Sequence, residues 1–531
     1  MLTDVTDPTT ARTIPDLVRR CAYAYPDRDA VVDGAVRLGF PQLADETERF
    51  ARGLIGHGVT PGDRVAIWAP NGWRWVVAAL GAVSAGAVLV PLNTRFKGAE
   101  AAYILGRTRA RLLITDDGFL GNHYVAMLDD QELPHLSTVV VMAGDPPRSA
   151  AGRSVLAWDD LLAGGAAVPV AEARRRAAAV APDDLCDIFF TSGTTGQPKG
   201  VLLAHGQTIQ LYVSWSERAT LRPGDRCLLV NPFFHTFGYK AGIIACLLRG
   251  TAIVPQPVLD VAATLDLVER ERITVLPGPP TLYTSILDHP ERAGRDLSSL
   301  RVAITGATTV PVALIERLRT ELAMPTVLTA YGLTESGGTA TMCRPEDTPV
   351  TVATTCGAPV PDVDVRVVGF DGVPLPAGEP GEVLIRGYNV TRGYFEDEAA
   401  TLEAIDSDGW LRTGDVGVLD ERGYLRITDR IKDMFIVGGF NAYPAEIEQT
   451  LARHPGVAEA AVVGVPDDRL GEVGRAFVVP HPGSDIEAAE VVAFCRANLA
   501  NYKVPRSVIL VEALPRNASG KVVKSSLREA M

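Results

Sequence analysis

Short apolar runs alternate along most of the chain with amphipathic segments. The apolar runs are rich in Val, Ile and Leu, as in strands that are buried on both faces of a parallel sheet. The segments between them, such as 260–272 and 310–322, carry apolar residues at helical spacing. This alternation predicts an α/β fold with layered sheets. The predicted strands are 63–69, 111–115, 138–142, 185–190, 226–230, 251–255, 273–278, 301–306 and 326–332.

Two later regions have a different pattern. Residues 357–428 are rich in turn residues, which predicts short antiparallel strands and a small β-barrel-like part. From about 433 a fresh α/β pattern begins, long enough for a domain of its own. We therefore expect a large N-terminal region of several subdomains over 1–431 and a smaller α+β domain over 432–531. The elements predicted in the smaller domain are helices 444–453 and 486–499 and strands 457–463, 474–480 and 506–512.

One stretch has the length of a membrane span. Residues 75–94 contain no charged side chain, but Gly81, Ser84, Gly86 and Pro91 interrupt them. A buried helix at about 72–84 followed by a buried strand at about 87–91 fits better, so we expect no membrane insertion. The N-terminus has early acids and no apolar core, so we expect no signal peptide.

The composition is that of a globular protein, with 531 residues of which 47% are hydrophobic and 22% charged. The net charge is −13, and no dense Lys/Arg run is present, which argues against a general nucleic-acid binder. The seven cysteines are scattered without zinc-ligand spacing, as expected for reduced thiols in the cytoplasm.

Lysine is scarce in this chain. Only seven of the 51 basic residues are lysine, and the others are arginine. Lysine offers a compact charge on a flexible stem, which arginine does not. Some lysines therefore stand out as candidates for chemistry, whereas Lys97 and Lys524 are attributed to chance. The seven are Lys97, Lys199, Lys240, Lys432, Lys503, Lys521 and Lys524.

The strongest local motif is the loop 191–200, which follows the predicted strand 185–190. It contains four hydroxyls, three glycines and one lysine but no acid, a combination that suits a polyphosphate. It is not the P-loop of kinases and ATPases. A plain connection is the alternative interpretation. The loop reads Thr191, Ser192, Gly193, Thr194, Thr195, Gly196, Gln197, Pro198, Lys199 and Gly200.

This loop resembles the signature of the adenylate-forming superfamily, which includes acyl-CoA synthetases, adenylation domains of nonribosomal peptide synthetases and firefly luciferase. Further motifs occur in the family's order, so the resemblance covers essentially the whole chain. It implies an N-terminal adenylation domain, a mobile C-terminal domain, and ATP, Mg²⁺ and coenzyme A as small molecules. The further motifs are YGLTES (331–336), WLRTGD (410–415), DRIKD (429–433) and RNASGK (516–521).

The resemblance also implies roles for single residues in adenylation. Tyr331 lies against adenine, Thr334 contacts the α-phosphate, and Glu335 ligates Mg²⁺. Lys521 is the catalytic lysine that bridges the substrate carboxylate and the α-phosphate. The remaining residues implied at the nucleotide are Gly332, the wall residues Gly306, Ala307 and Thr308, the ribose ligand Asp415, and Arg430 beside it.

The implied reaction has two steps, and the second requires a domain rotation. A carboxylic acid first attacks ATP to give an acyl-adenylate and pyrophosphate, and the thiol of coenzyme A then attacks the acyl carbon. No general base is needed for the first step, because the carboxylate is already ionised at pH 7. Lys432 lies at the implied hinge, and the pantetheine passes Gly438, Gly439 and Phe440.

The segment 231–240 is the expected wall of the acyl pocket, with His235 at the gating position. It contains no acid, which disfavours an amino-acid substrate. The longer segments 231–247, 273–290 and 341–357 resemble actinobacterial fatty-acid-ligase-like enzymes that act on polycyclic sterol-ring or terpenoid acids. The pocket residues expected are Phe234, Phe237, Gly238, Tyr239 and Gly337.

Several alternatives stay open at this point. The acyl group can go to a carrier protein or a partner ligase instead of coenzyme A, and the acid can be a fatty or aryl acid. A luciferase-type oxygenase and a non-catalytic nucleotide binder are weaker readings. A homodimer is compatible with the sequence.

Overall fold

The computed structural model describes residues 6–144, 146, 152–191, 197–306, 310–369, 371–431, 433–437, 440–467, 469–499, 501–516 and 522–529. The chain divides into two compact units. One contains Met1–Asp364 and Ile385–Leu411, and the other contains Val365–Leu384 and Arg412–Met531. The division runs through three strands of one four-stranded sheet. A domain boundary at Lys432 stays a prediction.

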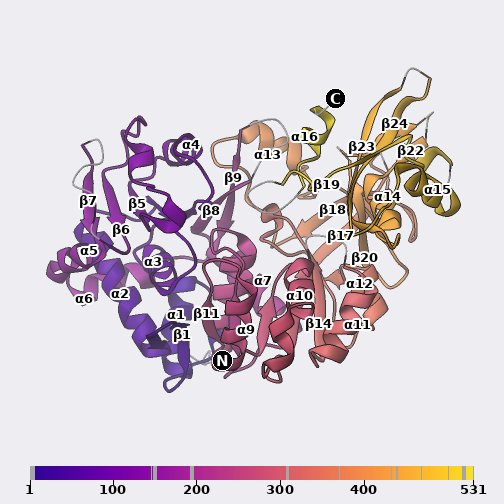
Figure 1. Cartoon of the computed structure of the whole chain (residues 1–531). Helices are drawn as coiled ribbons and strands as arrows, with labels where there is room; N and C mark the ends of the chain where they lie inside the picture. Colours follow the sequence, from indigo (N-terminus) through magenta and orange to yellow (C-terminus); the bar gives the residue numbers. More distant parts are fainter. Residues whose placement is uncertain are drawn as a thin grey trace. The chain divides into compact units, whose positions relative to one another are not determined.

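The first unit contains a seven-stranded sheet whose strands are parallel except for its last pair. Figure 1 shows β5, β6 and β7 side by side in the indigo to purple part of the chain. In spatial order the strands are β7 (Ser154–Ala157), β6 (Thr138–Val141), β5 (Leu112–Thr115), β3 (Arg64–Trp68), β4 (Val88–Pro91), β8 (Leu185–Thr191) and β9 (Lys199–Ala204).

A nine-stranded sheet forms the rest of the scaffold of this unit. Its central strands are parallel, and its ends add antiparallel strands. In spatial order they are β16 (Ala358–Pro359), β15 (Thr341–Met342), β14 (Thr326–Tyr331), β13 (Val302–Gly306), β12 (Val275–Pro277), β10 (Arg226–Leu229), β11 (Ala252–Pro255), β1 (Asp29–Asp33) and β2 (Val36–Gly39).

Helix α3 (Trp73–Ser84) contacts β1 of the nine-stranded sheet and β3 and β4 of the seven-stranded sheet. All of its residues from Trp75 to Ser84 are therefore buried. The uncharged stretch 75–94 thus forms a buried helix and strand, as predicted. None of the helices in the described ranges has the length and hydropathy needed to cross a bilayer.

The other helices of the first unit cover the sheets and connect their strands. One of them, between Phe237 and Ile244, is a π-helix that runs directly into α8. The α-helices are α1 (Ile14–Ala24), α2 (Phe40–Gly56), α4 (Gly98–Thr108), α5 (Trp158–Gly164), α6 (Val170–Ala179), α7 (His205–Arg218), α8 (Ala245–Arg249), α9 (Val261–Arg270), α10 (Pro280–Leu287), α11 (Val312–Glu321), α12 (Pro349–Thr354) and α13 (Glu398–Ala404).

The turn-rich region forms a four-stranded sheet, and the C-terminal part forms a five-stranded sheet with three helices. Apolar side chains from both faces of the antiparallel pair β23–β24 build a separate core. The elements are β17 (Val363–Val368), β18 (Gly381–Gly387), β19 (Leu411–Leu419) and β20 (Leu425–Arg430), followed by β21 (Phe435–Val437), β22 (Phe440–Ala442), α14 (Pro444–Leu451), β23 (Val457–Asp467), β24 (Gly471–Pro480), α15 (Ala488–Asn498), β25 (Ser507–Leu510) and α16 (Lys524–Glu529).

The buried His205, at the first position of α7, predicts a pH dependence of stability. Its Nδ1 accepts a hydrogen bond from the backbone N–H of Ile14 at 3.3 Å. Burial, reinforced by the charge of Lys240, lowers the pKa of His205 to about 3. Below about pH 6.5 the unfolded chain binds a proton that the folded chain refuses, so acid destabilises the fold by up to about 1.4 kcal/mol per pH unit through this group.

We expect His205→Asn, whose side-chain oxygen can replace Nδ1 as the acceptor, to reduce this sensitivity. The thermal midpoint is measured at pH 7 and pH 5 for both proteins. The drop between the two values should be smaller in the variant. Equal drops would show that His205 binds protons equally in the folded and unfolded states and contributes nothing to the acid sensitivity.

Candidate active site

The predicted phosphate loop joins β8 to β9, which form an antiparallel hairpin. Thr191 and Lys199 are directly paired at its end, so they flank the loop. The hydroxyl of Tyr103 donates to the carbonyl of Pro198 at 3.3 Å and ties α4 to the end of the loop. The loop residues Ser192, Gly193, Thr194, Thr195 and Gly196 lie outside the described residues.

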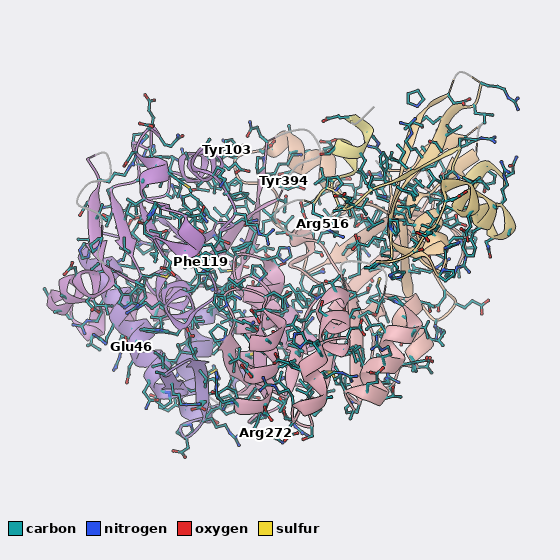
Figure 2. The ribbon with its side chains drawn as sticks, in the orientation of Figure 1. Glu46, Tyr103, Phe119, Arg272, Tyr394 and Arg516 are labelled. Carbon is teal, nitrogen blue, oxygen red and sulfur yellow. The ribbon has the colours of Figure 1, made fainter. Side chains whose placement is uncertain are left out.

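Glu335 meets this hairpin. Its Oε1 accepts hydrogen bonds from the Tyr394 hydroxyl at 3.0 Å and from the Thr191 hydroxyl at 3.4 Å. Burial, together with the charge of Glu335, raises the pKa of Tyr394 well above its usual range. The Lys199 ammonium lies 5.1 Å from the centre of the Tyr394 ring, and Figure 2 labels Tyr394 and Tyr103. A carboxylate, a hydroxyl and a cation thus converge where the loop begins and ends.

Tyr394 belongs to none of the motifs found in the sequence. It reaches Glu335 because Tyr394 forms a β-bridge with Val201 in β9, and the neighbouring Phe395 N–H donates to the Gly200 carbonyl at 2.7 Å. This pairing joins segments far apart in the chain, so no local pattern could have revealed it.

The environment of Glu335 fits a magnesium site of the kind that phosphates complete. Within the described part of the chain, its second oxygen, Oε2, accepts no hydrogen bond. No cluster of three or more His, Cys, Asp or Glu side chains suited to a metal occurs among the described residues. Mg²⁺ commonly binds through one or two carboxylates together with substrate phosphates and water. This arrangement is compatible with the predicted role of Glu335 as the protein ligand of Mg²⁺, which stays a prediction.

The parallel strands β13 and β14 end side by side next to this carboxylate. Gly306 pairs with Ala330, and Tyr331 and Gly332 follow directly. A Cβ on Gly306 would lie 2.9 Å from the Ala330 carbonyl oxygen, and one on Gly332 would lie 2.5 Å from Cα of Thr339. Gly306 thus allows β13 and β14 to end close together, and Gly332 allows residues 338–339 to approach the chain just after β14. Ala307 and Thr308 lie outside the described residues.

Thr334 and Glu335 form a single turn, Thr334–Ser336, directly after this edge. The Ser336 hydroxyl accepts from the Leu333 N–H at 2.9 Å and fixes the turn. Gly337 follows in the left-handed region at φ +68°, and its carbonyl accepts from the Tyr212 hydroxyl at 3.0 Å. The turn that holds Glu335 is thus anchored to α7.

The expected acyl-pocket residues lie at the start of the π-helix. Phe234 and Phe237 are half-buried, and His235 is exposed and accepts at Nδ1 from the Phe237 N–H at 3.3 Å. A Cβ on Gly238 would lie 2.1 Å from the Pro232 carbonyl oxygen, which requires a glycine there. Tyr239 is fully buried, with its ring 5.5 Å from Trp75 and 6.3 Å from Phe189.

In the second unit, Asp415 and Arg430 are directly opposite each other on β19 and β20. Asp415 is buried, and its N–H donates to the Thr413 hydroxyl at 3.1 Å. The two expected positions are thus neighbours in the backbone pairing of the sheet. Phe440 is the first residue of β22. Lys432, Gly438, Gly439 and Lys521 lie outside the described residues.

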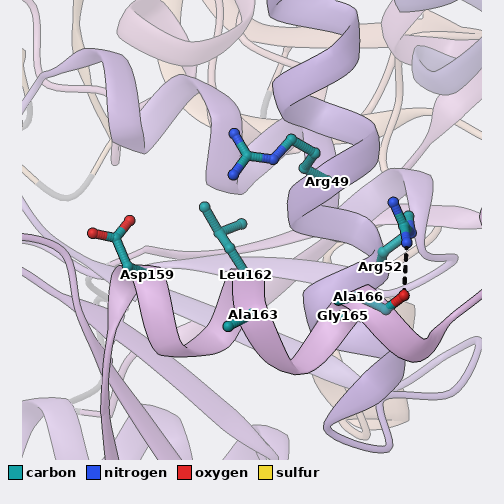
Figure 3. Close-up of a pocket in the computed structure, with 7 residues that line it drawn as sticks. All are labelled: Arg49, Arg52, Asp159, Leu162, Ala163, Gly165 and Ala166. Atoms are coloured by element: carbon teal, nitrogen blue, oxygen red, sulfur yellow. Dashed lines mark hydrogen bonds between the residues drawn. The ribbon is translucent and has the colours of Figure 1, made fainter.

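A cavity of about 420 Å³ lies elsewhere in the first unit, between α2 and α5 (Figure 3). Its two cations are already engaged, because Arg52 donates to the carbonyls of Val168 and Ala166, and Arg49 pairs with Glu46. The other lining residues include the exposed Asp159 and the small residues Ala163 and Gly165. This cavity contains none of the predicted site residues.

The predicted phosphate loop, the Glu335 carboxylate at its ends and the nearby edge of parallel strands are the arrangement expected of a nucleotide-dependent enzyme. The chain belongs to the AMP-binding enzyme family, which it matches over residues 18–395. It also matches the AMP-binding enzyme C-terminal domain over residues 446–521. The resemblance to adenylate-forming acyl-CoA synthetases is thereby confirmed.

Two similar proteins carry the name 3-[(3aS,4S,7aS)-7a-methyl-1,5-dioxo-octahydro-1H-inden-4-yl]propanoyl:CoA ligase. The one from Rhodococcus jostii is 53% identical and covers 97% of this chain and 98% of its own. The one from Mycobacterium tuberculosis is 54% identical and covers 98% and 99%. Among solved structures, the anthranilate CoA ligase AuaEII in complex with anthranoyl-AMP has a TM-score of 0.86 and 29% identity and covers 98% and 97%.

The comparisons confirm the predicted class of enzyme, an AMP-forming acid–thiol ligase with an α/β fold. They also bear out the expected use of ATP, Mg²⁺ and coenzyme A, with a small carboxylic acid as substrate. The roles of single site residues, the homodimer and the cytoplasmic location stay predictions.

Proposed function

We propose that this enzyme joins coenzyme A to a bicyclic keto-propanoic acid of the kind named for its two relatives. The observation that carries the proposal is 53–54% identity over nearly the whole chain, which includes the acyl-side segment. That segment supports it chemically. The half-buried rings of Phe234 and Phe237 suit a broad apolar ring system, and residues 231–240 offer no carboxylate for an ammonium group.

In the first step, the loop 191–200 binds the phosphates of ATP, with Lys199 as its cation. Glu335 would hold Mg²⁺, which would supply positive charge for the phosphates, and Thr334 contacts the α-phosphate. Lys521 stabilises the charge that develops as the substrate carboxylate attacks phosphorus and pyrophosphate leaves. The protein accelerates this step by positioning and by electrostatics, since no residue has to remove a proton.

In the second step, rotation at Lys432 removes Lys521 and brings the segment 438–440 to the acyl-adenylate. The glycines there leave room for the narrow pantetheine arm. The thiolate attacks the acyl carbon, and AMP leaves. We propose that the reaction takes place in the cytoplasm and that two copies of the chain can associate as a homodimer.

A product assay by mass spectrometry tests the proposal. The enzyme is incubated with Mg·ATP and one acid at a time: bicyclic keto-propanoates, diterpenoid acids, aryl acids and fatty acids, each with and without coenzyme A. We expect acyl-CoA only for the bicyclic keto-propanoates, and acyl-AMP from the same acids when coenzyme A is omitted. Glu335→Gln, handled identically, sets the background.

Other outcomes would overturn parts of the proposal. Acyl-CoA from aryl or fatty acids alone would mean that the substrate class is wrong. Acyl-AMP without acyl-CoA would mean that the acceptor is a carrier protein or a partner ligase.

A further inference from the structure

A fully buried ion pair lies behind the acyl-side segment. The Lys240 ammonium is 3.0 Å from Asp187 Oδ2, and neither side chain is exposed to solvent. Lys240 also donates to the Thr208 hydroxyl at 2.8 Å, and the Cys186 thiol donates to Asp187 Oδ2 at 3.0 Å. The ammonium lies 5.8 Å from the centre of the Phe189 ring.

This pair joins three elements, each of which carries or holds part of the site. Asp187 lies on β8, four residues before Thr191 at the phosphate loop. Lys240 lies in the π-helix, three residues after Phe237. Thr208 lies on α7, whose Tyr212 holds the Gly337 carbonyl behind Glu335. The pair therefore links the strand that leads into the phosphate loop to the helix that carries the acyl-side segment.

Stability does not explain this pair. Desolvation of two charges commonly outweighs their attraction, and well-packed apolar residues often serve equally well. Burial raises the pKa of Asp187 although Lys240 opposes the shift. Asp187 Oδ1 is buried and has no hydrogen-bond partner among the described residues. The unsatisfied oxygen adds to the cost of burying the pair, and a role in fixing a local geometry is one reason for which a buried ion pair is retained.

The geometry that needs fixing is the π-helix. The i→i+5 hydrogen-bond pattern is rare in proteins, and where it does occur it is often at a functional site. Relaxation to the ordinary i→i+4 pattern would change the direction of the side chains that precede Lys240. Phe237 and the segment before it would then move relative to β8.

We propose that the Lys240–Asp187 pair is a positioning device that sets the acyl-side segment 234–239 against the phosphate-loop strand and thereby decides which acids are accepted. The proposal rests on the proposed function, because it assumes that the enzyme activates a carboxylic acid and concerns which acids it accepts.

The test compares three proteins: wild type, Lys240→Met and the double variant Lys240→Met/Asp187→Leu. The single variant should have a lower thermal midpoint, because it leaves the Asp187 carboxylate unpaired. The double variant should recover the midpoint of the wild type or exceed it. Its KM for the preferred acid should nevertheless stay about tenfold or more above that of the wild type, whereas KM for ATP changes by less than about twofold.

A second variant keeps the test decisive if the apolar pair does not fold. Lys240→Gln/Asp187→Asn keeps hydrogen-bonding groups but removes both charges, and the same split between the two KM values is expected. Hydrogen–deuterium exchange without substrates gives an independent readout. Peptides covering 237–244 should exchange faster in either double variant than in the wild type, with other peptides of the first unit unchanged.

Two results would overturn the proposal. One is a double variant whose acid KM and acid selectivity match those of the wild type, which would make the pair merely structural. The other is a parallel rise of both KM values with a lower midpoint, which would indicate general damage. If no acid in the panel is activated by the wild type, the proposed function fails, and the exchange rates of 237–244 alone decide on the positioning role.

Discussion

Lys521→Ala should reduce acyl-adenylate formation by on the order of 1000-fold, since it removes the cation that stabilises charge developing at the α-phosphate. The same variant should convert synthetic acyl-adenylate and coenzyme A into acyl-CoA at a rate within about threefold of the wild type, because in the proposed mechanism Lys521 acts only in the first step. The two half-reactions are measured separately, the first by release of pyrophosphate and the second by mass spectrometry.

Lys524→Ala is the matched control for this prediction. Lys524 lies three residues further along the chain, and its ammonium is 2.8 Å from Glu448 Oε1. Partly exposed ion pairs contribute little, so both half-reactions should stay near the wild-type rate. Near-normal adenylation by Lys521→Ala, or an equal loss in both variants, would remove Lys521 from the catalytic role.

The architecture of the first unit could be predicted because its central strands, such as β3, β4, β5 and β11, are buried on both faces. Such strands appear in the sequence as continuous apolar runs, and the segment 185–190, for example, forms most of β8. The π-helix between Phe237 and Ile244 could not be predicted in this way. Its residues are apolar nearly throughout, so they show no period, and packing on all sides decides the hydrogen-bond pattern.

The site motifs could be predicted because each is a short contiguous segment of the sequence, but the partners of their side chains could not. Thr191 and Glu335 belong to two recognised motifs, whereas Tyr394, which donates to Glu335, belongs to none. The Asp187–Lys240 pair is an intermediate case, because the sequence indicates that each residue is buried but does not indicate its partner. Each residue is a lone charge within an apolar run, which signals a buried charge that needs a partner. The pairing itself depends on how β8 and the π-helix pack.

Glu335→Gln should lower the rate of acyl-adenylate formation by at least on the order of 100-fold, because it removes the negative charge that is proposed to hold Mg²⁺. The glutamine oxygen can still accept from Tyr394 and Thr191, so the local hydrogen bonds survive. The fold should therefore persist, and the defect should appear mainly as a higher Mg²⁺ concentration for half-maximal rate. A magnesium titration of pyrophosphate release measures this shift.

Tyr394→Phe separates the charge of Glu335 from its hydrogen bonds. It removes the 3.0 Å hydrogen bond but keeps the carboxylate, so the rate should fall by only about tenfold or less. The Mg²⁺ concentration for half-maximal rate should stay close to that of the wild type. If Glu335→Gln kept both the rate and the magnesium dependence of the wild type, Glu335 would be a structural anchor of the 334–336 turn and the cation would bind elsewhere. If both variants showed the same shift in magnesium dependence, the hydrogen bond that orients the carboxylate would matter as much as its charge.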